Sequence, residues 1–338
     1  MEPISILLIL VTVLSQEVDH FTLTELKSTR MKNILYKSIF IFGLVWATSG
    51  LAQIEPMYGM YRFNANAINP AQAGSSKQMD VALLSRWQWS TLEGAPKTHV
   101  ASFSTPYREN VGFAVNMVSD NIGPVSDFYL GADYAYQIPI SNETKLSGGI
   151  RLSVINHRVN LANRNIIDQT DEAFKYNLNS GFRVNPGLGF LLINPKYYVG
   201  FSMPRILRYS YGDQFNISTY KDVQHTFLYA GFEKELNRDI TLRPSFISNF
   251  AVNSPLSIDV NVTASVFDRF DIGLMYRLQD AIGLVTGYRF TNGLYLGYSY
   301  EYPISQMRRV TRMSNEFALR FTFDDFREKK ILTPRYFN

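Results

Sequence analysis

Cysteine is absent from the 338 residues of this chain. Its absence excludes disulfides, thiol nucleophiles, and zinc or iron–sulfur sites with cysteine ligands. Histidine is scarce, because the chain has only four and they stand singly, which argues against a histidine-rich metal site. Charge is also low, with 18% charged residues and a net charge of +4, so the sequence indicates no nucleic-acid partner.

Long hydrophobic runs are missing from most of the chain. After Ala52, polar residues or glycine break each apolar run within a few residues, so no helix could cross a bilayer there. Near the amino-terminal end, lysines precede a short apolar run at 39–45, and small residues follow it up to Ala52. We therefore expect residues 31–52 to be a secretory signal peptide, since the run is too short for a membrane anchor. Translation would then begin at Met31, and we interpret residues 1–30 as a spurious upstream extension.

Aromatic residues and strict alternation are what the chain has in abundance. It contains 24 Phe and 21 Tyr, and they cluster toward the ends of alternating segments. In one such segment, Ile258, Val260 and Val262 alternate with Asp259 and Asn261. Alternation over about 9–11 residues predicts a tilted, membrane-spanning strand with one apolar and one polar face. A soluble β-sandwich is the alternative, but strand length, aromatic clustering and export favour a membrane barrel.

We predict an all-β fold, a transmembrane antiparallel β-barrel of about 14 strands and of the outer-membrane type. The fourteen segments are 79–90, 98–107, 111–120, 128–138, 144–156, 186–193, 197–204, 224–235, 239–249, 257–267, 270–278, 281–290, 294–302 and 315–323. Connections after even-numbered segments are short, and those after odd-numbered ones are mostly longer, with Gln279-Asp280 as the exception. Short periplasmic turns and longer outer loops give this asymmetry, which predicts that both termini face the periplasm.

The predicted barrel spans residues 79–323, and the segments on either side of it lack clean alternation. Residues 53–78 are rich in Asn, Ala and Gly and could either plug the lumen or lie in the periplasm. Residues 324–338 form a mixed-charge tail, which we predict to be periplasmic and available to a partner.

Catalytic motifs are missing as well. Gly187 and Gly189 begin like a dinucleotide fingerprint, but Leu192 occupies the position of the third glycine. His99 cannot meet Ser102 or Ser104 on one face of a regular strand, which leaves only a Ser–His pairing with a distant residue. We therefore predict no enzyme, and no catalytic, cofactor-binding or metal-binding residue.

Charged residues interrupt the polar faces of the segments. They are Arg86, Asp133, Arg151, Glu233, Asp259, Glu301 and Arg320. They could line a selective pore or a binding surface, but we favour an internal ion-pair network. Three arginines, Arg308, Arg309 and Arg312, form a basic patch in a predicted outer loop, where they could bind anionic lipopolysaccharide or an acidic partner, or simply be solvated.

A set of short motifs lies in residues 61–107. The first is Asn69-Pro70-Ala71 with Ala73-Gly74, followed by Arg86-Trp87-Gln88-Trp89, Gly94-Ala95-Pro96-Lys97-Thr98, Phe103-Ser104 and Thr105-Pro106. On these motifs the chain resembles the PorP/SprF family of the Bacteroidetes type IX secretion system. The positions that carry the resemblance are Asn69, Pro70, Gly74, Arg86, Trp87, Gln88, Trp89, Gly94, Pro96, Lys97 and Thr98.

The resemblance implies a non-enzymatic barrel in the cell outer membrane, in contact with outer-membrane lipid. It implies a role in type IX protein secretion and gliding motility, in which the barrel binds, helps export or anchors a secreted surface adhesin with a type IX sorting domain. Periplasmic components of the secretion system are further implied partners. The alternative function is that of a general or selective porin.

The motifs also allow local predictions. Pro70 and Gly74 fit a turn just before the first strand. In a regular strand, Trp87 and Trp89 would share the outward face and anchor at the outer membrane interface, while Arg86 and Gln88 would point inward. The Gly94 and Pro96 positions fit the first outer loop.

Overall fold

The computed structural model describes residues 58–76, 78–160, 178–212, 219–252 and 254–323. The predicted upstream extension, the signal peptide, residues 53–57 and the carboxy-terminal tail lie outside these described residues.

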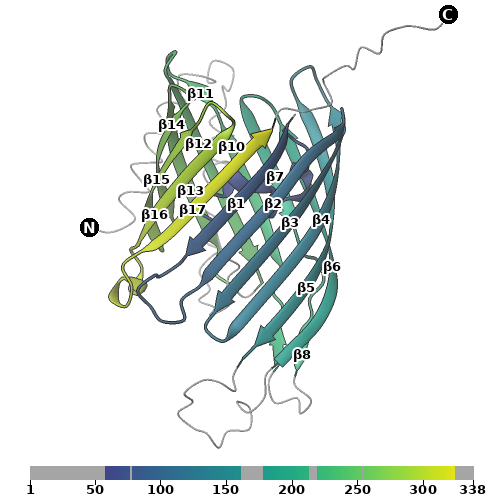
Figure 1. The fold of residues 1–338 in the computed structure, drawn as a ribbon, viewed down its shortest axis with the longest axis vertical. Coiled ribbons are helices and arrows are strands. Elements are labelled where there is room, and N and C mark those ends of the chain that lie inside the picture. Colours follow the sequence, from purple (N-terminus) through teal and green to yellow (C-terminus); the bar gives the residue numbers. More distant parts are fainter. Residues whose placement is uncertain (1–57, 77, 161–177, 213–218, 253, 324–338) are drawn as a thin grey trace, which may run out of the picture. The chain divides into compact units, whose positions relative to one another are not determined.

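Fourteen long strands form a closed antiparallel β-barrel, which confirms the predicted fold class (Figure 1). They are β1 (Met79–Trp87), β2 (Lys97–Arg108), β3 (Val111–Ile122), β4 (Val125–Pro139), β5 (Lys145–Val159), β6 (Leu178–Ile193), β7 (Tyr197–Met203), β10 (His225–Phe232), β12 (Ile240–Ala251), β13 (Ser257–Val266), β14 (Phe270–Arg277), β15 (Ala281–Arg289), β16 (Leu294–Pro303) and β17 (Ser314–Phe323). Long strands adjacent in this order pair with one another, and β1 pairs with β17 to close the barrel. The short β11 (Lys234–Glu235) pairs with β12, while β8 (Ser210–Gly212) and β9 (Thr219–Lys221) form a separate hairpin.

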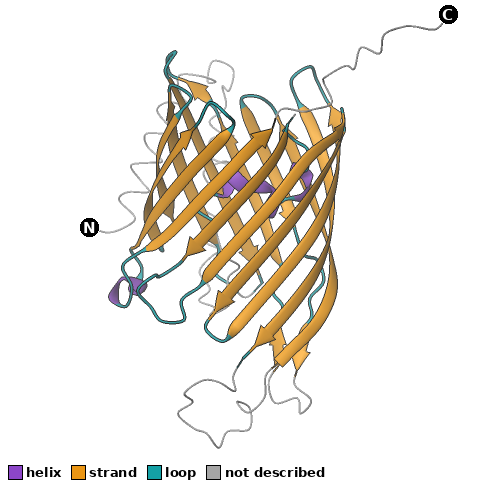
Figure 2. Ribbon diagram, in the orientation of Figure 1, coloured by secondary structure: helices purple, strands orange, loops and turns teal. Residues whose placement is uncertain are grey.

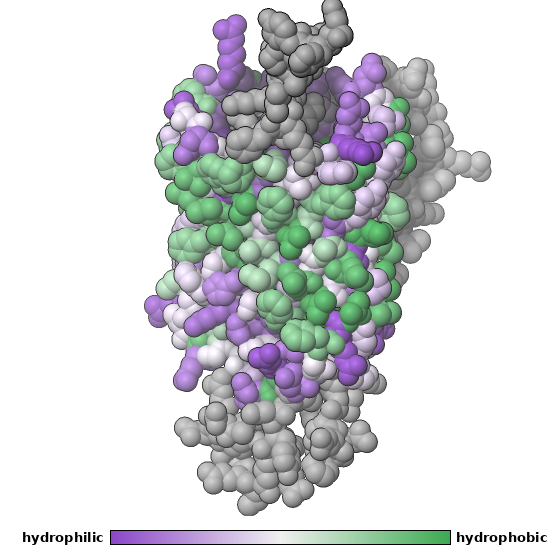
Figure 3. Space-filling model, turned by 45° about the vertical axis from the view of Figure 1, so that its right-hand side comes forward, coloured by the Kyte–Doolittle hydropathy of each residue, from purple (hydrophilic) through white to green (hydrophobic). Residues whose placement is uncertain are grey.

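Alternation places apolar side chains outside and polar ones inside. On β14, Ile272 and Leu274 are exposed, whereas the intervening positions are buried. Figure 3 shows a hydrophobic band around the visible face, with more hydrophilic residues toward both ends. Closure satisfies the backbone N–H and C=O groups within the sheet, as the lipid interior requires. Among the described residues, no helix has the length and apolar character to cross a membrane.

The two ends of the barrel differ in their connections. At the end where β1 begins and β17 finishes, the connections are short turns such as 109–110 and 194–196. At the other end, the lower one in Figure 1, longer connections such as 88–96 and 304–313 occur. We call these the short-turn end and the long-loop end. The predicted longer loop around 121–127 is wrong, because β3 and β4 continue to a two-residue turn whose Gly123 adopts a left-handed φ of 57°.

Most strand boundaries differ from the prediction, and two of the differences have a local cause. The first strand ends at Trp87 rather than at residue 90, because Trp89 adopts a left-handed φ of 49° that ends extended backbone. β6 begins at Leu178, eight residues before the predicted start at 186, and pairs with β5 beyond a register shift between Asn156 and Arg158. This extension reads in sequence as loop, since its many Asn, Ser and Gly residues hide the alternation.

The lumen is occupied by the chain that precedes β1. This chain contains two short 3-10 helices, η1 (Tyr61–Ala67) and η2 (Pro70–Gln72), which lie within the barrel (Figure 2). They form one apolar cluster with wall residues. From the lumen segment it includes Tyr58, Met60, Tyr61, Ile68 and Ala71, and from the wall Leu84, Val100, Leu191, Phe227, Tyr229 and Ile247. The core of this barrel is therefore a contact between its own amino-terminal segment and its inner wall.

Candidate functional site

The candidate site is the interface between the inner wall and residues 58–76, which we call the plug. The sequence left open whether this region fills the lumen or lies in the periplasm, and the structure places the described part in the lumen. Its start is buried, with Met60 and Tyr61 each 1% exposed. At η2, Pro70 fixes the backbone of the first turn and the Asn69 side chain caps it by accepting a hydrogen bond from the Ala71 N–H.

Asn69 fastens the middle of the plug to three strands. Its Nδ2 donates to the carbonyl oxygen of Phe190 at 3.1 Å and to that of Phe201 at 3.4 Å. The same amide nitrogen donates to the Tyr229 hydroxyl at 2.9 Å, and Oδ1 accepts from the Ala71 N–H at 2.8 Å. Asn69 is fully buried, so loss of its carboxamide would leave these partner groups with no hydrogen bond and no water to replace it.

Glycines in the wall let the plug backbone approach closely. A Cβ atom at Gly149 would lie 2.3 Å from the Ala71 nitrogen, and one at Gly112 would lie 2.2 Å from the Ala73 oxygen. A Cβ atom at Gly189 would lie 2.0 Å from Asn69 Oδ1. Glycine inside a strand commonly marks such an approach of backbone to backbone. These positions, on β3, β5 and β6, form a contact surface for the plug backbone that only glycine allows. We call it the glycine seat.

Arg151, on β5, donates hydrogen bonds to two backbone carbonyl groups of the plug. Its Nη1 donates to the Ala67 oxygen at 2.8 Å, and its Nη2 donates to the Asn66 oxygen at 2.6 Å. The other side of the guanidinium makes a two-point contact with Asp133, at 2.6 and 2.7 Å. Asn116 in turn donates to Asp133 at 2.7 Å. The arginine is therefore oriented by the wall and engages two plug carbonyls at once.

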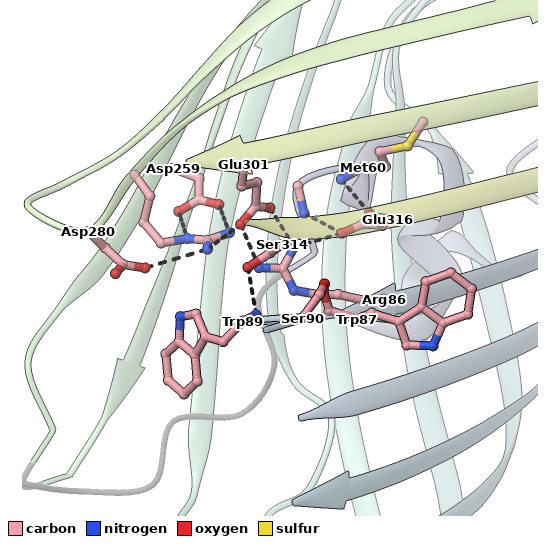
Figure 4. Close-up of polar contacts among 12 residues, drawn as sticks. Met60, Arg86, Trp87, Trp89, Ser90, Asp259, Asp280, Glu301, Ser314 and Glu316 are labelled. Atoms are coloured by element: carbon pink, nitrogen blue, oxygen red, sulfur yellow. Dashed lines mark hydrogen bonds and ion pairs between the residues drawn. The ribbon is translucent and has the colours of Figure 1, made fainter. Parts of the chain in front are cut away.

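Glu316, on β17, accepts hydrogen bonds from two backbone N–H groups of the plug (Figure 4). Its carboxylate accepts from the N–H of Gly59 at 3.0 Å and of Met60 at 2.7 Å. Arg86 Nη1 donates to the same carboxylate at 3.0 Å. Arg86 also makes a two-point contact with Glu301, with Nη2–Oε2 at 2.6 Å.

The charges around Arg86 do not balance within the wall. Arg277 makes a two-point contact with Asp259, at 2.8 Å for each bond, and reaches Glu301 at 3.1 Å. Two buried arginines therefore face three buried carboxylates, those of Asp259, Glu301 and Glu316. The plug N–H groups supply the additional hydrogen bonds that a buried anion needs. The Glu316 carboxylate thus has its full set of hydrogen bonds only with the plug in place.

The predicted charged residues accordingly form an ion-pair network rather than an open lining. Besides the groups described above, Glu233 pairs with Arg62 of the plug at 2.9 Å and with Arg243 at 3.2 Å. Arg320 pairs with Asp80 at 3.3 Å. These pairs lie toward the short-turn end, where the side chains are more exposed. They are therefore weaker contributors than the buried pairs.

Aromatic rings complete the interface. Phe63 of the plug stacks on Tyr295 with ring centroids 4.5 Å apart, and Tyr61 meets Tyr229 edge to face at 6.4 Å. Burial raises the pKa of the Tyr61 phenol well above its ordinary range, so the ring enters the lumen as a neutral group.

The tryptophan motif lies at the long-loop end of β1, and only its first half is a strand. Trp87 points outward and packs edge to face on Phe317 at 5.4 Å. The prediction that Trp89 shares this face is wrong, because the strand ends at Trp87 and Trp89 has a left-handed backbone. The Trp89 N–H donates to Ser314 Oγ at 3.0 Å instead (Figure 4).

The third motif shapes the first long loop and the start of β2. Gly94 adopts a left-handed φ of 74° and accepts a hydrogen bond from the Gly123 N–H at 2.8 Å. The Pro96 carbonyl accepts from the Gln88 N–H at 3.0 Å. Thr98 points inward and donates to Asp120 at 2.6 Å, whereas Lys97 is exposed on the outside. This motif joins the connection 88–96 to the turn between β3 and β4 at the long-loop end.

The basic patch lies apart from the plug. Arg308 and Arg309 fall on a short 3-10 helix, η4 (Gln306–Arg309), in the long-loop connection between β16 and β17, and Arg312 follows it. All three side chains are exposed.

A Ser–His contact that the sequence left open is present between strands. Ser85 Oγ and His99 Nδ1 lie 3.0 Å apart on the outer face of β1 and β2. Within the described part of the chain, no carboxylate forms an ion pair or hydrogen bond with His99. The pair therefore lacks the third group that would orient a catalytic base.

Sequence reasoning missed Glu316, Gly149 and Tyr229 as site residues. Glu316 belongs to a clean alternating segment, and no neighbouring residue in the sequence indicates its contact with the plug. The double glycine Gly148-Gly149 within a predicted strand is the one signal that could have pointed to a close backbone approach.

Asn69→Asp is expected to lower the free energy of unfolding by about 2 kcal/mol or more, since the donors to Phe190, Phe201 and Tyr229 are lost without change of shape. Denaturant titration of the refolded barrel measures it. The deficit should shrink at low pH, where a protonated aspartate regains a donor. A variant as stable as the parent at neutral pH would contradict the role of this amide.

Comparison with known proteins gives one family. The family model described as type IX secretion system membrane protein PorP/SprF matches residues 50–321. No curated protein matches the sequence. Similar solved structures include a FadL homologue from Pseudomonas aeruginosa, with 11% identity over 81% of this chain and 96% of that chain, at a TM-score of 0.43. The CymD monoaromatic hydrocarbon channel is 10% identical over 76% and 91%, at 0.46, and the NanC porin is 11% identical over 73% and 99%, at 0.38.

Proposed function

Because the chain belongs to the PorP/SprF family of type IX secretion system membrane proteins and lies in the outer membrane, we propose that it is a closed, non-catalytic barrel that binds, helps export or anchors a secreted surface adhesin. The observation that carries the proposal is the plug. Two of the motifs on which the resemblance rests, those around Asn69 and Arg86, meet in its interface with the wall.

A closed lumen favours a binding role over a transport role. Passage of solute requires a continuous aqueous path, whereas here an apolar cluster and the hydrogen bonds of Glu316 and Arg151 join the plug to the wall. Binding would then use the surfaces that the barrel leaves free, namely the long-loop end toward the exterior and the short-turn end toward periplasmic components of the secretion system.

Deletion of the gene tests this function. We expect the adhesin to be retained in the cell or released into the medium, and gliding motility to fail if the adhesin serves it, while uptake of small solutes stays normal. Immunodetection of the adhesin on intact cells and in culture supernatant measures the outcome, and complementation with the full chain is the control. Unchanged surface display would reject the adhesin role.

A general or selective porin is the alternative function. It predicts steady single-channel conductance when the purified barrel is inserted into planar bilayers. The closed, plugged protein is expected to give none. Conductance of the unmodified chain, together with slower solute uptake in the deletion strain, would favour the porin instead.

A further inference from the structure

A groove of about 880 Å³ crosses the lipid-facing wall of the barrel over β15, β16, β17, β1, β2 and β3. Two parallel rows of outward side chains line it. The row nearer the long-loop end contains Ser85, His99 and Ser119, and the row beneath it contains Leu83, Ala101 and Met117. Ser85, Ala101 and Ser119 are small side chains among bulkier neighbours, and the wall is hollowed where they lie.

Three side chains of the upper row are polar, although they face lipid, and Phe317 and Tyr298 continue the row on β17 and β16. Ser85 Oγ contacts His99 Nδ1 at 3.0 Å, and Ser119 stands opposite His99 in the register of β2 and β3. His99 is exposed on the outer face. Polar and ionisable groups at membrane depth are costly, and they commonly mark a functional site. The row therefore offers hydroxyl and imidazole groups to a ligand that itself lies in the membrane.

Cations lie above this row. Lys97 is exposed on the same face of β2, two residues closer to the long loops than His99, or about 7 Å along the strand. The connection between β16 and β17, whose strands both line the groove, carries the exposed Arg308, Arg309 and Arg312. Glu93 and Asp280 are the two acidic residues in the connections at this end of the groove strands, 88–96, 123–124, 278–280 and 304–313.

We propose that this groove binds lipid A of the outer leaflet. From the long loops inward, the wall presents the loop arginines, then a row with Lys97 and Trp87, then the row in which Phe317 stands beside Ser85 and His99, then the apolar row. Lipid A presents phosphates, a sugar backbone, hydroxylated acyl chains and hydrocarbon in the same order. Basic residues at the membrane surface bind anionic headgroups, and the hollow wall receives an acyl chain beside the polar row.

The geometry supports binding and not cleavage of the lipid. In the described part of the chain no carboxylate contacts His99, so the Ser–His pair has no group to stabilise an imidazolium. Ser85 lies within β1, whose backbone pairs with β2 and β17 on its two sides, so no free N–H groups stand ready for an oxyanion.

Binding is tested with the full-length barrel in detergent, titrated with diphosphoryl lipid A and observed by native mass spectrometry. The triple variant Arg308→Gln/Arg309→Gln/Arg312→Gln should weaken binding at least about tenfold, because each surface cation contributes to headgroup attraction. Ala101→Trp, which fills the groove, should weaken it similarly. Ala230→Trp, an outward substitution on β10 outside the groove, is the matched control and should leave binding unchanged.

The control lipids separate lipid A from other anionic lipids. We expect phosphatidylglycerol to compete poorly and lipid A lacking its phosphates to lose most of its affinity. Equal affinity of the parent, the triple variant and Ala101→Trp would overturn the proposal. Equal competition by phosphatidylglycerol would overturn the choice of lipid A, and purification of the barrel with a protein covering the groove would replace lipid by a protein partner.

Discussion

Arg86→Met is expected to lower the free energy of unfolding by about 3–5 kcal/mol, the usual cost of removing one partner from a buried ion pair. The guanidinium is 1% exposed and contacts Glu301 and Glu316, both of which would stay buried. The plug N–H groups would then be the main remaining support of the Glu316 carboxylate. Equilibrium unfolding in guanidinium chloride, with the barrel refolded into vesicles, measures the loss.

Two comparison variants separate this effect from loss of any luminal charge. Arg320→Met removes an arginine whose side chain is 31% exposed and whose partner Asp80 lies at 3.3 Å, so we expect a cost of only about 0–1 kcal/mol. Glu316→Gln balances the buried charges and keeps an oxygen that can accept from the plug, so its cost should also stay below that of Arg86→Met. Equal losses in Arg86→Met and Arg320→Met would show that the buried contacts of Arg86 stabilise the barrel no more than the exposed pair of Arg320 does.

The sequence predicts the wall of this barrel well because the physical signal is local. In a strand between lipid and lumen, each residue faces one solvent and its neighbours face the other, so a segment such as 257–267 reveals its conformation by itself. The prediction is less accurate where a strand leaves the lipid. The extended start of β6 and the left-handed Trp89 both lie beyond the alternating stretch.

What fills the lumen could not be predicted in the same way. A polar inner face looks alike whether it meets water, a loop or an ion pair. The contact of Arg86 with Glu316 depends on the register of β1 against β17, which joins residues 230 positions apart. Pro70 and Gly74 predict a turn before the first strand, and only the packing of η2 against β5 and β6 shows what that turn is for.

Gly149→Ala is expected to displace the plug, because the added methyl group would lie 2.3 Å from the Ala71 nitrogen and 2.4 Å from the Pro70 carbonyl carbon. Neither backbone atom can move without breaking the contacts of Asn69. Overpacking of this kind costs about 1–3 kcal/mol, so plug release should become about 5- to 150-fold more frequent.

The absence of native cysteine makes this release measurable by thiol labelling, because one introduced cysteine is then unique. Ile68→Cys places a thiol on the plug at a position that is 3% exposed. Labelling by a water-soluble maleimide should be slow in that variant alone and faster by the stated factor when Gly149→Ala is added. Gly148→Ala is the matched control, since its methyl group would meet only Phe190, at 4.0 Å, and should leave labelling slow. Equal rates in the two alanine variants would show that the plug does not depend on its glycine seat, and that its hydrogen bonds and the apolar cluster are enough to hold it.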